Sequence, residues 1–253
     1  MADSLCDFLK TDSRRERTLA VVGDVEGPIQ SLFEESFGGL DVGIESSELL
    51  DSKEATVALV EDGEVAATSP MAAIRDAILL VNSDLYTSGL SGIDKHEAPE
   101  VLTELDEQVV TLRGFPASVK EKLLLIVISR YIERQALEAG GGRLDVAFQR
   151  LSRLCDEYGT KKVYERLATT AVDVHTYGVP DRRPTDIPEL TVHGGDSERY
   201  RRSWFVVFTP PPEGDTEPAA LVAVETGENV WRSMWTYDAE QVAAIQQHIQ
   251  EAF

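Results

Sequence analysis

The chain contains four histidines and two cysteines, the side chains most often used to bind metals or to act as nucleophiles and bases. They are His96, His175, His193, His248, Cys6 and Cys155. No two histidines have the spacing of an HExxH motif, and the cysteines lack the CxxC spacing of a zinc site. The residues therefore predict no metal ligand, no cofactor and no catalytic group, and we expect a protein that is not an enzyme.

Glycine-rich and acidic segments do not give a phosphate site. Residues 140–142 follow a helical pattern and lack the lysine of a phosphate-binding loop. Residues 23–27 stand between a predicted strand and a predicted helix, but Asp24 and Glu26 would repel an anion there. A receiver-type phosphoacceptor is also rejected, because the acidic residues after 56–60 form a tight turn and no matching lysine appears.

Arginines gather in one stretch of this acidic chain, on both sides of Trp204. Arginine forks match planar anions and the carboxylates of a partner, so the stretch predicts a ligand- or partner-binding site. The predicted residues of that site are His175, Tyr177, Arg182, Arg183, Arg201, Arg202, Trp204 and Trp235. The alternative interpretation is that these arginines pair with acidic residues of the same chain.

The charge of the chain is strongly negative, with 45 acidic and 24 basic residues and a formal net charge of −21. At molar salt the Debye length falls to about 3 Å, which screens the self-repulsion of such a surface. Acidic residues spread along the whole chain and a preference for arginine over lysine resemble haloarchaeal cytoplasmic proteins, and they predict a halophilic protein. An ordinary acidic protein is the alternative. Binding to nucleic acid is disfavoured, because it requires a basic face.

No apolar run reaches the roughly 20 residues that a membrane-spanning helix needs, and no apolar signal-peptide region is evident near the N-terminus. We therefore expect a cytoplasmic protein without membrane insertion.

The first part of the chain, residues 1–115, has the pattern of an α/β layer. Strands are predicted at 18–22, 41–45, 56–60 and 64–67, with helices at 29–37 and 71–81. Ser69-Pro70 is predicted to cap the second helix, and residues 82–99 are predicted to form a loop.

The second part, residues 116–253, begins with the strongest helical pattern, at 118–139. This helix is apolar nearly all round from Leu123 to Ile128, which is typical of a helix buried in a core or at a subunit interface. We interpret it as a core helix, with a dimer interface as the alternative, so the oligomeric state stays open. Apolar residues then recur at helical spacing over 144–155, where Cys155 is taken as a small core residue, and a further helix is predicted at 160–170.

Strands alternate with turns over the rest of the chain. They are predicted at 172–177, 189–192, 203–208, 219–225 and 229–237, and Asp238 caps a final helix to Phe253. The sequence thus predicts an α/β protein, with α+β character in its second half. A mixed sheet ends in an antiparallel C-terminal meander and is packed by helices, including one long central apolar helix. The two parts are expected to pack as one globular unit.

Seven segments in series resemble the DICT sensory domain family, which occurs with diguanylate cyclases and two-component systems. They are residues 128–137, 148–154, 163–168, 172–181, 203–208, 219–225 and 235–238. The first part looks like the front half of haloarchaeal members. The resemblance implies a non-enzymatic role in signal input or protein interaction. The chain carries no kinase, GGDEF or helix-turn-helix segment, so a stand-alone member would act through another protein.

We therefore expect a cytoplasmic sensory or regulatory protein that acts in signal transduction through protein–protein contacts, with a small ligand between the helices and the meander as an additional input. One alternative is an adaptor or scaffold that controls a cell state such as shape or motility without a ligand. Another is an enzyme of unrecognised type, which would require His175, Glu133 and Arg202 to meet in a cleft.

Overall fold

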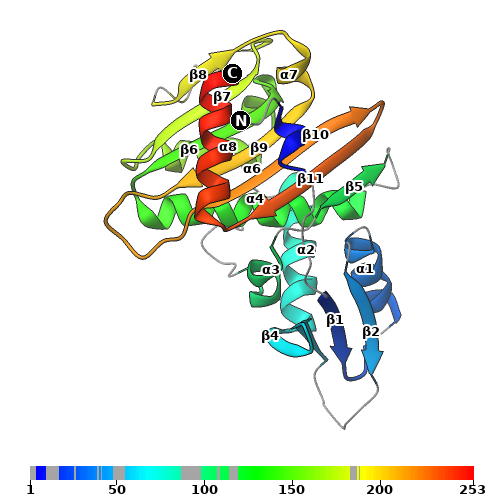
Figure 1. The fold of residues 1–253 in the computed structure, drawn as a ribbon. Helices are drawn as coiled ribbons and strands as arrows, with labels where there is room; N and C mark the ends of the chain where they lie inside the picture. The colour runs from blue at the N-terminus through cyan, green and yellow to red at the C-terminus, as the bar shows by residue number, and fades with distance from the viewer. Residues whose placement is uncertain are drawn as a thin grey trace.

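The computed structural model describes residues 4–9, 17–25, 27–38, 40, 42–47, 55–86, 98–106, 109–113, 119–182, 187 and 189–253. The first elements are η1 (Leu5–Asp7), β1 (Arg17–Val22), α1 (Gly27–Phe37), β2 (Gly43–Ser47), β3 (Thr56–Glu61), β4 (Glu64–Pro70), α2 (Met71–Tyr86) and α3 (Glu100–Glu104). Four of them form a sheet in the order β2-β1-β3-β4, which lies in the lower part of Figure 1. Only β1 and β2 run parallel.

The remaining elements build a larger sheet with helices on both faces. They are β5 (Val110–Arg113), α4 (Val119–Ala139), β6 (Arg143–Arg150), α5 (Ser152–Asp156), α6 (Tyr158–Leu167), β7 (Asp173–Val179), β8 (Thr191–Gly194), α7 (Glu198–Arg201), β9 (Ser203–Thr209), β10 (Ala219–Gly227), β11 (Val230–Thr236) and α8 (Ala239–Ala252). The strand order is β5-β11-β10-β9-β6-β7-β8. The predicted antiparallel meander, β9-β10-β11, is confirmed, and the pairs β6–β7 and β7–β8 are parallel.

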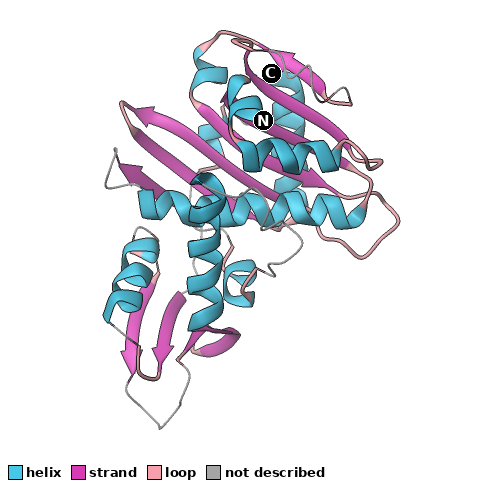
Figure 2. Ribbon diagram, turned by 180° about the vertical axis from the view of Figure 1, so that it is seen from behind, coloured by secondary structure: helices cyan, strands magenta, loops and turns pink. Residues whose placement is uncertain are grey.

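The two faces of this sheet pack against different helices. Leu144, Val206 and Leu221 point to the face that α4 and α6 cover. Phe205, Val207 and Val222 point to the opposite face, under α8. Figure 1 shows α8 in front of the sheet, and Figure 2 shows α4 from behind. The first described residues also lie on the α8 face, where Phe8 contacts His248 of α8 with 5.9 Å between the ring centres.

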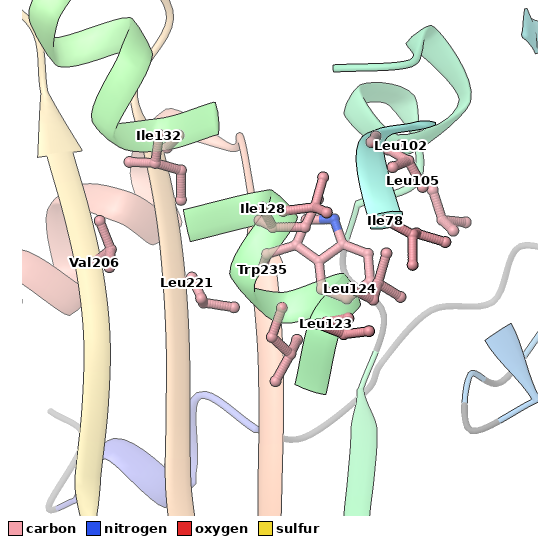
Figure 3. Close-up of a cluster of buried hydrophobic side chains, with 14 of the residues drawn as sticks. Ile78, Leu102, Leu105, Leu123, Leu124, Ile128, Ile132, Val206, Leu221 and Trp235 are labelled. Carbon is pink, nitrogen blue, oxygen red and sulfur yellow. The ribbon is translucent and has the colours of Figure 1, made fainter. Parts of the chain in front are cut away.

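Helix α4 is the central helix of the molecule, as the sequence predicts. Leu123, Leu124, Leu125, Ile126, Val127 and Ile128 are all buried. On one side the helix packs against the large sheet, and on the other side it contacts α1 and α2. Figure 3 shows Leu124 and Ile128 between Trp235 of β11 and Ile78 of α2. A helix with packed neighbours on all sides needs apolar residues all round, so α4 is a core helix.

Residues 144–150 form a strand, and the helix predicted over 144–155 is wrong there. β6 pairs with β7 on one edge and β9 on the other, and helices cover both of its faces. Its buried apolar residues, Leu144, Val146 and Ala147, therefore do not alternate strictly with polar ones. Leu144 and Ala147 are three residues apart, which is also a helical spacing. Only residues 152–156 become helical, as α5, and Cys155 there is half-buried.

Two boundaries in the first part also differ from the prediction. β4 continues to Pro70, and the Ser69 hydroxyl accepts a hydrogen bond from Val101 N–H at 3.0 Å. A proline is tolerated there because β4 is an edge strand. Helix α2 extends to Tyr86, into the segment predicted as loop. Among the described residues, no helix has the length and apolar character that crossing a membrane requires.

Candidate functional site

Two histidines that lie far apart in the sequence meet on the α8 face of the large sheet. The parallel register of β7 and β8 sets Tyr177 opposite His193 and His175 opposite Thr191. This brings His175 Nδ1 to 2.8 Å from His193 Nε2. The ring centres are 5.1 Å apart and the ring planes differ by 16°, so the imidazoles lie almost end to end in one plane.

A carboxylate fixes which nitrogen of each ring carries a proton. His175 Nε2 lies 2.9 Å from Asp173 Oδ2, and an ionised carboxylate can only accept a hydrogen bond. His175 Nε2 therefore carries the proton in the neutral ring and leaves Nδ1 as an acceptor. His193 Nε2–H then donates to His175 Nδ1. The three side chains form a directed chain of hydrogen bonds that ends at the Nδ1 atom of His193.

A buried carboxylate, Asp145 of β6, organises the side chains next to the histidine pair. It is fully buried and accepts hydrogen bonds from three side chains. These are Arg143 Nε at 2.8 Å and Nη2 at 2.7 Å, Tyr177 Oη at 2.8 Å, and Gln246 Nε2 of α8 at 3.1 Å. The forked pairing with Arg143 and the two further donors satisfy a charge that is costly to bury alone.

Tyr177 joins the carboxylate to the histidine pair. Its ring stacks on His193 with 4.4 Å between ring centres and 9° between planes. Burial, followed by the Asp145 carboxylate, raises the pKa of Tyr177, so the phenol stays protonated and donates to Asp145. The pKa of His193 is lowered, first by burial and then by His175. The neutral form of His193 is therefore favoured in the folded protein.

The three predicted arginines that the structure describes lie on the surface and pair within the chain. Arg182 Nη1 contacts Asp156 Oδ1 at 2.7 Å, Arg202 Nε contacts Glu198 Oε2 at 2.6 Å, and Arg201 Nε donates to the Asp196 carbonyl at 2.9 Å. Among the described residues, no hydrogen bond or ion pair joins these arginines to the histidine pair. Arg183 lies outside the described residues.

The two predicted tryptophans have different surroundings. Trp204 is half-buried on β9, opposite Ala223 of β10. Trp235 is fully buried in the main core, beside Leu124 and Ile128 in Figure 3. Of the seven predicted residues that the structure describes, only His175 and Tyr177 come together in one cluster, and Trp235 has no exposed surface.

Sequence reasoning missed the partners of this cluster, Arg143, Asp145 and His193. Asp145 and Arg143 lie on the strand that was interpreted as a helix, so their shared face was hidden. His193 is 18 residues from His175 and becomes its neighbour only through strand pairing. The signal available in the sequence was a second histidine directly after the next predicted strand, 189–192. Among the described residues, no group of three metal-binding side chains occurs.

A second buried polar network lies on the other face of the sheet, between α4 and α6. Glu133 accepts hydrogen bonds from Arg130 Nη1 at 2.6 Å and Tyr164 Oη at 2.7 Å. Arg130 Nη2 also reaches Thr160 Oγ1 at 2.9 Å. Glu133 therefore does not meet His175 or Arg202, as an enzyme cleft built from those three residues would require.

A pair of tyrosines marks the contact between α4 and the end of the meander. Tyr131 and Tyr237 meet edge to face, with ring centres 6.0 Å apart. Gln135 Nε2 donates to Tyr131 Oη at 3.1 Å. The Tyr237 hydroxyl and Gln135 Oε1 are buried without a hydrogen-bond partner. Exchanging the amide atoms of Gln135 would still leave one of them unpartnered, so this contact retains unused hydrogen-bonding groups.

A family model described as "Sensory domain in DIguanylate Cyclases and Two-component system", abbreviated DICT, matches residues 99–226. The matched stretch runs from the start of α3 almost to the end of β10. It contains Asp145, His175, Tyr177 and His193, whereas β11 and α8 follow it. No curated protein matches the chain.

Proposed function

Because the chain belongs to the DICT family of sensory domains, we propose that it receives a signal in the cytoplasm and transmits it through contact with a protein partner, without catalysing a reaction. The family match over residues 99–226 is the observation that carries this proposal. It assigns a sensory role in signal transduction, and the partner contact is our extension of that role. A halophilic surface with a net charge of −21 is part of the same proposal.

The proposed partner surface is the outer edge of the large sheet, at β8. This strand is the last in the sheet order, so one side of its backbone has no neighbouring strand in the described sheet. Val192 at its centre has 41% of its surface exposed. A partner strand can add to such an edge through main-chain hydrogen bonds and contact its side chains. Arg182, Arg201 and Arg202 already pair within the chain and contribute less to this proposal.

The two parts of the chain, 1–115 and 116–253, are proposed to work as one unit. β5 of the first part pairs with β11 of the second, and Arg232 Nη2 donates to the Leu9 carbonyl at 2.7 Å. One hydrophobic cluster contains Leu19 and Phe33 as well as Leu144 and Trp235. These contacts support a unit in which α4 is shared by both parts.

Crosslinking tests the partner surface. A photoactivatable amino acid at Val192 is expected to capture one defined partner, a signalling protein, from an extract of the protein's own cells in molar salt. The same amino acid at Tyr158 of α6, which is 55% exposed, serves as the matched control and is expected to capture much less of that partner. Equal capture from both positions would contradict the β8 surface. Turnover of a substrate by the purified chain would contradict the non-catalytic role.

The proposed ligand site is the contact between Tyr131, Gln135 and Tyr237. Burial and the neighbouring Glu217 raise the pKa of Tyr131, and burial and Tyr131 raise that of Tyr237. Both phenols therefore stay neutral. Together with the unpartnered amide atom of Gln135, they would suit a small polar molecule that exchanges hydrogen bonds with neutral groups.

Native mass spectrometry distinguishes a ligand-binding sensor from an adaptor that has no ligand. The chain purified from its own cells is expected to carry an additional mass that is lost on denaturation. Tyr237→Phe removes only the unpartnered hydroxyl. The fraction of protein that carries the additional mass is expected to fall at least about tenfold, which corresponds to the loss of about one hydrogen bond to the ligand. Tyr158→Phe is the control and should retain the ligand. A wild-type protein without additional mass would favour the adaptor.

A further inference from the structure

The histidine pair holds β8, one of the two edge strands of the large sheet. β8 pairs only with β7 in the described sheet, over the four positions from His175–Thr191 to Gly178–Gly194. Most of its residues are exposed. The His175–His193 hydrogen bond and the stacking of Tyr177 on His193 connect the side chain of His193 to β7, and the Thr176 hydroxyl donates to the Thr191 carbonyl at 3.5 Å. Such a short edge strand belongs to the least stable part of a fold.

The geometry of the pair allows one added proton but not two. In the neutral pair, a single proton lies between the facing nitrogens, 2.8 Å apart. One added proton can be placed on the outer nitrogen of His193, and the N–H···N bond is kept. If His175 takes it instead, His193 can accept with its other tautomer, and the bond is again kept. A second added proton puts an N–H on both facing atoms, so two donors and two positive charges oppose each other.

We propose that His175 and His193 form a proton-operated latch, which holds β8 on the sheet when the pair shares one proton and releases β8 when both rings are charged. This inference rests on the proposed function, because it names the signal of the same surface, a fall in pH. Release of β8 would uncover the edge of β7 and change what a partner strand can bind. The latch itself needs no ligand other than the proton, and the small molecule proposed at Tyr131 and Tyr237 has no part in it.

The charged groups around the pair decide the pH at which the latch opens. Arg143 and Asp145 of β6, and Asp173 and Tyr177 of β7, face the two rings. The uncharged side chains of Gln246 on α8, bonded to Asp145, and of Phe253 directly after α8, packed on Tyr177, also lie here. The two carboxylates favour charged histidines, whereas Arg143 and the second histidine oppose them.

The direction of the pH effect follows from proton counting. Undocking exposes His193 to water, where its pKa returns to about 6.5. In the docked state its pKa is lower, because of burial and then His175. The released state therefore binds more protons as the pH falls below about 6.5, and docking of β8 weakens in that range. Above that pH the full stability of the docked strand is present.

A shared metal ion does not fit this geometry. The two nitrogens point directly at each other, and a metal between them would need about 2.0–2.1 Å to each nitrogen, or roughly 4 Å in total. The observed 2.8 Å is a hydrogen-bond distance. In the part of the chain that the structure describes, no third ligand completes a metal-binding group.

Hydrogen exchange of the purified, full chain in molar salt tests the latch. Amide exchange, corrected for its intrinsic pH dependence, is compared at about pH 8 and about pH 5, which bracket histidine titration. The amides of residues 191–194 are expected to exchange at least about tenfold faster at the lower pH, while those of β9 and β10 change little. Because no partner is present, this result is independent of whether the proposed partner contact exists.

Two variants separate the pair from other histidines. His193→Gln places an amide N–H where Nε2 lies and cannot be protonated, so its β8 amides are expected to stay protected at both pH values. His248→Gln on α8 is the matched control and should respond like the wild type. In the wild type, ¹⁵N spectra of the imidazoles should show the N–H···N bond at high pH and its loss at low pH.

Three results would overturn the latch. The first is a wild-type β8 whose corrected exchange does not change between the two pH values. The second is a His193→Gln protein that responds to pH as the wild type does. The third is an N–H···N bond between His175 and His193 that persists at low pH in the imidazole spectra of the wild type. This result decides the question if His193→Gln fails to dock β8 at either pH.

Discussion

Replacing Trp235 by alanine is expected to lower the free energy of unfolding by about 4 kcal/mol. The indole is fully buried and lies against Leu124 and Ile128 of α4, with Ile78 of α2 on the far side of these residues. Alanine would leave a large cavity where three parts of the fold meet, and these packed elements cannot close it without moving. Denaturant unfolding in molar salt measures the loss.

Two matched variants show whether the cavity is the cause. Trp235→Phe keeps most of the buried ring and removes Nε1, which has no hydrogen-bond partner, so we expect a loss of only about 1 kcal/mol. Trp204→Ala removes a half-buried indole and should cost about 1–2 kcal/mol. If Trp235→Ala were as stable as the wild type but failed to bind the partner, its assignment to the core would be contradicted.

Replacing Glu133 by alanine is also expected to be strongly destabilising, by about 3–5 kcal/mol. Glu133 has 3% of its side chain exposed and Arg130 has 20%. Burial by itself would lower the pKa of Arg130, and the Glu133 carboxylate more than offsets this, so the guanidinium is firmly charged. Burial, followed by Glu133, raises the pKa of Tyr164, which donates to the same carboxylate. Alanine would leave a buried cation and a buried hydroxyl without their acceptor.

The control for this change lies one turn further along the same helix. Glu138 pairs with Arg134 at 2.6 Å, but its side chain is 59% exposed. Glu138→Ala is expected to change the free energy of unfolding by less than about 0.5 kcal/mol. Thermal or denaturant unfolding of both variants under the same salt makes the comparison. Equal losses would show that general weakening of α4, rather than a buried network, causes the effect at Glu133.

Local sequence patterns predicted most of the elements, because those patterns depend on neighbours along the chain. The apolar run of β1, the turns of the meander and the Asp238 cap, whose carboxylate accepts from Gln241 N–H at 2.7 Å, are all visible in the sequence. The all-round apolar character of residues 123–128 correctly indicated a core helix. β6 was missed because a strand buried on both faces has no alternation to distinguish it from a helix.

The candidate site depended much more on tertiary structure. The sequence by itself determined that the chain is an acidic α/β protein with the segments of a sensory family, and it singled out His175 and Tyr177. Only the fold decided that Trp235 is core, that Asp145 is buried beneath Tyr177, and that His193 faces His175. The physical reason is that helical and strand patterns are local, whereas hydrogen bonds between side chains require the register of strands that pair across distant parts of the chain.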